Sequence, residues 1–180
     1  MSWSSSSRRR ASRRLLVAGM VLALGACFRP LYGPTASGVP VRDSLAAIQV
    51  DTINTLRGQE RLGHFLRSEL IFDLDGSGRT AQKRYKLVID AAEAVQITSA
   101  DTTSGRANAG MLNVTARYRL TTLDGKRELT AGVARATATY FRDPQRFASL
   151  RAARDAEMRA SAQVADDIKQ RLAALFATSP

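Results

Sequence analysis

Residue types that form covalent cross-links and metal sites are almost missing from this chain. It has one cysteine, Cys27, and one histidine, His64. A single cysteine cannot form a disulfide within the chain, and a single histidine excludes sites built from several histidine ligands. With one histidine, the chain also has few ways to build a Ser-His-Asp or Cys-His catalytic site. We therefore expect no metal, no cofactor and no catalytic residues, and interpret His64 as a polar residue on an amphipathic helix.

Acidic side chains are absent from the first 26 residues, which contain five of the arginines. The whole chain has a formal charge of +11, and without those arginines it has 22 basic and 16 acidic side chains, a net charge of +6. This excess favours anionic partners, either nucleic acid or anionic lipid. The export signal that the N-terminus contains excludes nucleic acid.

The N-terminal segment has the pattern of a lipoprotein export signal. Residues 1–14 are rich in Ser and Arg, and residues 15–26 read LLVAGMVLALGA. An apolar run of this length matches the central region of a signal peptide and is too short to span a bilayer comfortably. It ends in Leu24-Gly25-Ala26-Cys27, which resembles the lipobox of bacterial lipoproteins. We expect residues 1–26 to be removed and Cys27 to be acylated.

Two other interpretations of this segment remain. The apolar run can be an uncleaved anchor, or an ordinary cleaved signal followed by a cysteine by chance. The sequence Ser12-Arg13-Arg14-Leu15-Leu16 also resembles a twin-arginine signal, so the export route stays open. The residue after the cysteine is Phe28, not Asp, which by resemblance to lipoprotein sorting signals points to the outer membrane.

Residues 27–43 are interpreted as a lipidated N-terminus and tether. They contain three of the five prolines, which disfavour a helix. A simple tether has no need for large apolar side chains. We therefore expect Phe28, Leu31 and Tyr32 to contact the membrane interface or a partner.

Periodicity predicts the elements of residues 44–177, which we interpret as a single domain. We expect a strand over 44–55, a helix over 57–74, a strand over 82–97, a polar loop over 98–109 and a strand over 111–122. This loop can insert into the lumen of a partner, or it can be a mobile hairpin tip. Asp143-Pro144 is a helix-start signal, and the last helix should run to about Ala177.

Asp124-Gly125 predicts a two-residue hairpin after the strand over 111–122. That turn would pair Leu120 with Leu129, Tyr118 with Ala131, and Ala116 with Val133. Continuing this register puts Arg135 on the apolar face, so we expect a bulge near Gly132 that returns Ala136, Ala138 and Tyr140 to it.

The predicted order is strand, helix, three strands, helix. One face of the sheet is apolar and the other polar. The fold class is therefore α+β, a two-layer sandwich of a mostly antiparallel four-stranded sheet with two helices packed on one face.

Residues 27–33 read CFRPLYG, and this start of the mature chain resembles that of the LptE family. The element order is also similar to that family over about residues 27–177. The resemblance implies a non-enzymatic lipoprotein of the outer membrane that faces the periplasm. It further implies that the protein plugs and assembles the LptD β-barrel and binds lipopolysaccharide at the last step of its export.

Basic residues should gather at one end of the sheet, where the second strand starts, the third ends and the hairpin leads into the fourth. Phosphates of lipid A pair well with such side chains. The alternative is a solvated basic surface that keeps strand edges from aggregating. The candidate lipopolysaccharide-binding residues are Arg79, Lys83, Arg84, Lys86, Arg117, Arg119, Lys126 and Arg127.

Two other classes of function compete with this hypothesis. One is a different outer-membrane lipoprotein adaptor, either a barrel biogenesis factor or a secretion pilotin. The other is an enzyme, for which the acidic pairs Asp73/Asp75 and Asp166/Asp167 are the candidates. These pairs are more simply explained as a helix end and a solvated helix face.

The signal sequence makes one direct prediction. The mature N-terminus should be Cys27, carrying acyl chains, because the apolar run ends in a lipobox-like sequence. The intact mass of protein extracted from membranes measures this. A mature chain that begins elsewhere, or that has no acyl mass, would contradict it.

Overall fold

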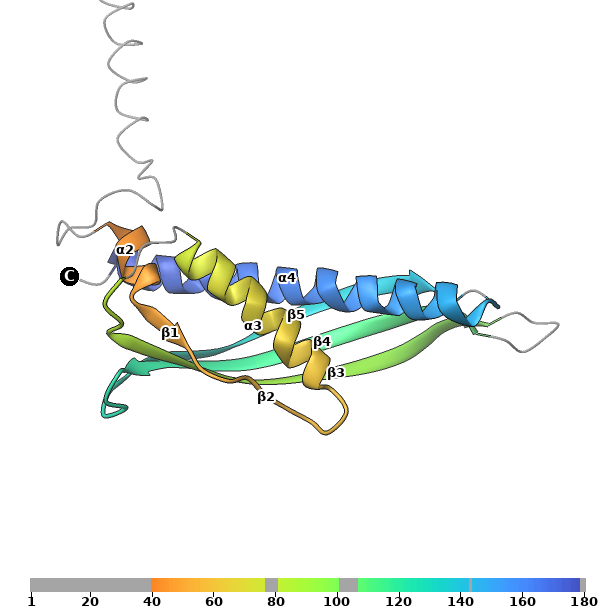
Figure 1. Ribbon diagram of the computed structural model, residues 1–180, viewed down its shortest axis with the longest axis horizontal. Coiled ribbons are helices and arrows are strands. Elements are labelled where there is room, and N and C mark those ends of the chain that lie inside the picture. Colours follow the sequence, from red (N-terminus) through yellow and green to blue (C-terminus); the bar gives the residue numbers. More distant parts are fainter. Residues whose placement is uncertain (1–39, 77–80, 101–106, 143, 179–180) are drawn as a thin grey trace, which may run out of the picture.

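A long sheet and a layer of helices on one of its faces make up the molecule. The computed structural model describes residues 40–76, 81–100, 107–142 and 144–178. Figure 1 shows all three described helices on the same side of the sheet. In chain order the elements are α2 Val41–Ala46, β1 Ile48–Val50, β2 Asn54–Thr55, α3 Glu60–Asp75, β3 Tyr85–Ala100, β4 Ala107–Thr122, β5 Glu128–Phe141 and α4 Arg146–Thr178.

The α+β two-layer fold predicted from the sequence is confirmed. Its N-terminal part has one helix and one strand more than predicted. The sheet order is β1-β3-β4-β5, and β2 also pairs with β3. The long strands β3, β4 and β5 are antiparallel, whereas β1 and β2 run parallel to β3. The sheet is therefore mixed and has five strands, because the first predicted strand is divided in two.

The prediction of one strand over residues 44–55 is wrong in its first part. Residues 41–46 form α2, so residues 44–46 of the predicted strand belong to a helix. Pro40 directly precedes this helix and Asp43 lies in its first turn, and both favour a helix start. Val41 and Leu45 are buried in the core, on one side of the short helix.

The hairpin register predicted from Asp124-Gly125 holds only next to the turn. Thr121 pairs with Glu128, but Leu120 pairs with Thr130, so Leu129 is the extra residue of a bulge. The predicted pairs of Leu120, Tyr118 and Ala116 are therefore wrong by one residue. The expected bulge exists, three residues before Gly132, and it puts Ala134, Ala136 and Ala138 on the buried face.

Two tyrosines cover glycines on the neighbouring strand. Tyr118 pairs with Gly132, and Tyr140 with Gly110. A Cβ atom at Gly132 would lie 2.6 Å from the Tyr118 hydroxyl, and one at Gly110 would lie 2.7 Å from the Tyr140 ring. Glycine inside a strand permits such close approach, so these positions let large rings fit under α4.

Helix α4 covers most of the apolar face and forms the core with α3. Its buried stripe includes Ala160, Val164, Ile168 and Leu172, as the 3.6-residue period predicted. The helix begins at Arg146, two residues after Pro144, and Asp143 lies outside the described residues. Strands β3 and β4 also extend into the predicted polar loop, to Ala100 and from Ala107.

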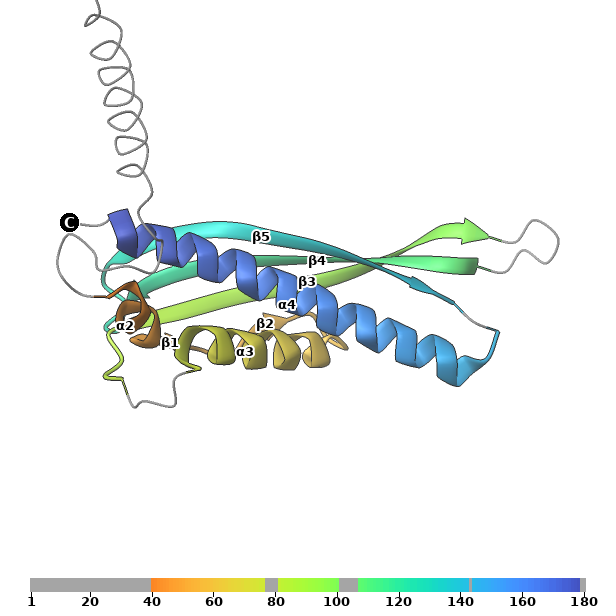
Figure 2. The same ribbon diagram turned by 90° about the horizontal axis from the view of Figure 1, so that it is seen from above.

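Figure 2 shows an elongated body with two distinct ends. Helix α2, the last turn of α4, the start of β3 and the β4–β5 hairpin lie at one end, which we call the α2 end. The end of β3, the start of β4, the end of β5 and the start of α4 lie at the other, the far end.

A buried carboxylate joins the start of α3 to α4. Glu157 of α4 is 2% exposed, and Arg61 Nε donates to its Oε2 over 2.7 Å. The Glu157 Oε1 atom is buried and has no hydrogen-bond partner among the described residues. Burial, and then the nearby Glu157 carboxylate, raise the pKa of Glu93 on β3. Two carboxylates thus share one guanidinium at this junction.

We expect Glu93→Gln to stabilise the protein at pH 7 and to change little at pH 4. A carboxyl group whose pKa is raised on folding stabilises the fold below its unfolded pKa, and this contribution is lost as pH rises through the folded pKa. Glutamine has the same shape without the charge. Thermal unfolding of both proteins at the two pH values measures the difference, and an equal effect at both would refute this electrostatic explanation.

Candidate functional site

The predicted basic cluster is partly assembled at the α2 end. The Leu123 amide donates to the Arg84 carbonyl over 2.9 Å, which joins the start of β3 to the β4–β5 hairpin. The side chains of Arg84, Lys126 and Arg127 are exposed there. No ion pair involves these three residues within the described part of the chain. They form the part of the predicted cluster that is available to an anion, and we call them the hairpin triad.

Lys83 and Lys86 are committed to carboxylates of their own chain. Lys83 Nζ lies 2.7 Å from Asp75 Oδ2 and donates to the Ala46 carbonyl over 2.8 Å. Lys86 Nζ lies 2.8 Å from Asp51 Oδ2, and this hydrogen bond lowers the pKa of Asp51. These lysines tie β3 to the end of α3 and to the chain after β1, so their charges are already matched.

Arg117 and Arg119 lie in the second half of β4, which ends at Thr122. Arg117 is paired in register with Asp90, and Arg119 with Val88. Both arginine side chains are exposed on the face opposite the helices. The remaining candidate, Arg79, lies outside the described residues, as do Cys27, Phe28, Leu31 and Tyr32.

The sheet face that carries these arginines is polar and uncovered. Within the described part of the chain, all helices pack on the opposite face (Figure 1). Thr137 Oγ1 donates to Asn113 Oδ1 over 2.8 Å, and Asn54 Nδ2 donates to Asp90 Oδ1 over 2.8 Å. The side chains of this polar face include Lys86, Asp90, Asn113, Thr115, Arg117, Arg119, Thr121, Arg135, Thr137 and Thr139.

A second basic surface at the far end was not predicted from the sequence. Phe141 and Phe147 are each 83% exposed there, and they are the most exposed large apolar residues of the described chain. Exposed arginines accompany them where β5 ends and α4 begins: Arg142, Arg146, Arg151 and Arg154. The sequence signal for this surface is the pair Phe141-Arg142 and the pair Arg146-Phe147, on either side of an Asp143-Pro144 motif that predicts only a helix start.

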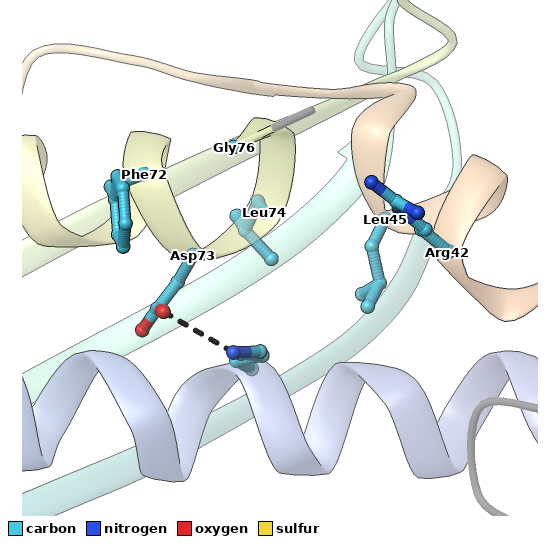
Figure 3. A pocket seen from close by; sticks show the side chains of 7 residues that line it. Arg42, Leu45, Phe72, Asp73, Leu74 and Gly76 are labelled. Atoms are coloured by element: carbon cyan, nitrogen blue, oxygen red, sulfur yellow. Dashed lines mark hydrogen bonds and ion pairs between the residues drawn. The ribbon is translucent and has the colours of Figure 1, made fainter. Parts of the chain in front are cut away.

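A pocket of about 480 Å³ opens at the α2 end, between α2, the end of α3 and α4. Figure 3 shows Leu45 and Arg42 facing the α3 residues Phe72, Asp73 and Leu74 across it. Lys169 Nζ of α4 donates to Asp73 Oδ1 over 3.2 Å at its side. Leu45 and Leu74 are nearly buried, whereas Phe72 is 72% exposed. The pocket therefore combines an apolar floor with a paired charge and an aromatic rim.

The described residues offer few other kinds of site. No group of three or more His, Cys, Asp or Glu side chains among them is placed to hold a metal ion. None of the described helices combines the length and the apolar character needed to cross a membrane.

Solved structures share this fold. A protein described as a lipoprotein from Caulobacter crescentus CB15 is 25% identical, with a TM-score of 0.60, over 77% of this chain and 97% of that one. A minor lipoprotein from Acinetobacter baumannii is 13% identical, with a TM-score of 0.53, over 72% of this chain and 92% of that one. No curated protein matches the sequence.

The family comparison covers most of the domain. The profile of the LptE family, described as lipopolysaccharide-assembly, matches residues 45–172. This range extends from α2 to the last turns of α4 and includes the whole sheet. It therefore confirms the family resemblance drawn from residues 27–33, which lie outside the match. The chain belongs to the LptE family of lipopolysaccharide-assembly lipoproteins.

Proposed function

We propose that this lipoprotein is anchored in the outer membrane through Cys27, that its domain plugs and assembles an LptD-type β-barrel, and that it binds lipopolysaccharide. The role is non-enzymatic, since membership of the family implies assembly and not catalysis. The observation that carries the proposal is the long sheet face that is polar and uncovered in the described chain.

The polar face fits the inside of a barrel better than it fits lipid. Side chains that point into the lumen of a membrane barrel are largely polar, whereas those that face lipid must be apolar. Threonine, asparagine and arginine side chains on β4 and β5 can hydrogen-bond to such a wall. A permanent plug should bury more than the ~1,600 Å² of a standard interface, and three strands of 14 to 16 residues offer the necessary length.

The hairpin triad is the proposed contact for lipopolysaccharide phosphates. Arg84, Lys126 and Arg127 are exposed and free of ion pairs in the described chain, so binding an anion does not require an existing pair to break. Charge-assisted bonds to phosphate are about twice as strong as neutral hydrogen bonds. Lys83 and Lys86, which hold Asp75 and Asp51, serve the fold.

A photo-crosslinking residue at Thr115 or Arg117 should capture a large β-barrel protein in cells. Both positions lie in the centre of the polar face, where a barrel wall would be within reach. The same residue at Ser68, exposed on the helical layer, is the matched control. Mass spectrometry of the cross-linked product identifies the partner.

Two results would contradict the plug. One is cross-linking only to lipid from the polar face, and the other is no cross-linking from any position across it. Either result would favour a different outer-membrane lipoprotein adaptor, because the polar face would then be free in the periplasm.

Replacing all three residues of the hairpin triad with Glu should weaken lipopolysaccharide binding at least about tenfold, which corresponds to about 1.4 kcal/mol. Salt should weaken binding by the wild-type protein more than by the variant, because ions screen charge pairing. The fold should survive, since these side chains are exposed.

The matched variant replaces Arg142, Arg146 and Arg151 with Glu at the far end, which makes the same change in net charge. Binding measured at two salt concentrations on both folded variants separates the sites. If only the far-end variant loses binding, the hairpin triad is a solvated surface and the phosphate contact lies at the far end.

A further inference from the structure

The structure offers a pocket at the same end of the domain at which the described chain begins. We propose that residues 28–32 of this same chain bind in the pocket between α2, α3 and α4, and so hold the lipid anchor against the α2 end. This assignment does not depend on the barrel or on lipopolysaccharide. It differs from the expectation that Phe28, Leu31 and Tyr32 contact the membrane interface or a partner.

The pocket presents an apolar surface that the described chain leaves incompletely covered. Its volume of about 480 Å³ lies within the range of sites that bind small ligands. Phe72 on its rim is 72% exposed. Burying an aromatic side chain is strongly favourable, and aromatic pairs gain about 0.5–1.5 kcal/mol beyond the area that they bury. Phe28 and Tyr32 supply such rings, and Leu31 supplies an aliphatic side chain.

The chain between Tyr32 and Pro40 is long enough for residues 28–32 to reach the pocket, and short enough to keep them close to it. Arg42 and Leu45, which line the pocket, follow Pro40 by two and five residues. Tyr32 precedes Pro40 by eight residues, and this length can extend by about 27 Å. A short linker of this kind gives a tethered group an effective concentration on the order of millimolar. A weak contact would therefore be well populated without any other partner.

Charge at the end of α3 is compatible with Arg29, the basic residue within the segment. The last turn of α3 contains Asp73 and Asp75 and no basic residue. The negative end of the helix dipole lies there as well. Lys169 and Lys83 each pair with one of the carboxylates, and of the two only Asp73 lines the pocket. Arg42 is the cation that faces this end across the pocket.

The consequence is a defined geometry between anchor and domain. Only Cys27 lies between the proposed bound segment and the acyl chains. Binding at the α2 end would therefore fix that end near the membrane surface and would direct the long axis of the domain away from it. A free tether would instead allow every orientation within its reach.

The test places p-benzoylphenylalanine at Tyr32 in the full-length, membrane-bound protein and irradiates intact cells. This substitution keeps an aromatic side chain. Digestion and mass spectrometry then locate the cross-linked peptide. We expect a cross-link within the chain, to peptides that contain Leu45 or Phe72. Cross-links only to another protein or to lipid, or none to this domain, would overturn the proposal.

Phe72→Ala should lower the yield of the internal cross-link about fivefold, as expected when one aromatic contact is lost. Phe147→Ala is the matched control, because it removes an equally exposed phenylalanine at the far end. Neither side chain belongs to the buried core, so both variants should keep the wild-type melting temperature. Equal yields in the two variants would show that the segment does not bind in this pocket.

Discussion

The whole molecule depends on covering one apolar face of a long antiparallel sheet. Strand β4 has 16 residues and helix α4 has 33. At about 3.4 Å per strand residue and about 1.5 Å per helical residue, both are roughly 50 Å long. One helix can therefore follow the strands along their length, while α3 and α2 fill the remaining width beside β3. The elongated shape results from this match of lengths.

Covering one face leaves the other available. The same alternation that buries Val114, Ala116 and Tyr118 exposes Arg117 and Arg119 on the other face. A face this long and polar does not suit an apolar partner, but its side chains can hydrogen-bond to a polar partner along its whole length. Family membership supports a role in lipopolysaccharide assembly, and the polarity of the face is an independent observation.

The ion pairs show which basic side chains hold the fold together and which can bind an anionic partner. Lys83 and Lys86 pair with carboxylates of segments that precede β3 in the chain. Arg61 performs the same task for the buried Glu157. The exposed basic side chains outside these ion pairs include the hairpin triad at the α2 end and the second basic surface at the far end. The basic character of the chain is therefore not one uniform patch.

The sequence by itself determined the family, the α+β class, the alternation of β4 and the buried stripe of α4, because these depend on local periodicity and on the short motif CFRPLYG. It did not determine the α2 helix, the position of the bulge at Leu129 or the partners of the lysines. A six-residue helix has too few turns to show a period, and the hairpin motif predicts the turn but not the position of an extra residue in the strand after it. Only the tertiary structure decided which cations are free, because the ion pairs of Lys86 with Asp51 and of Lys83 with Asp75 join different segments of the fold.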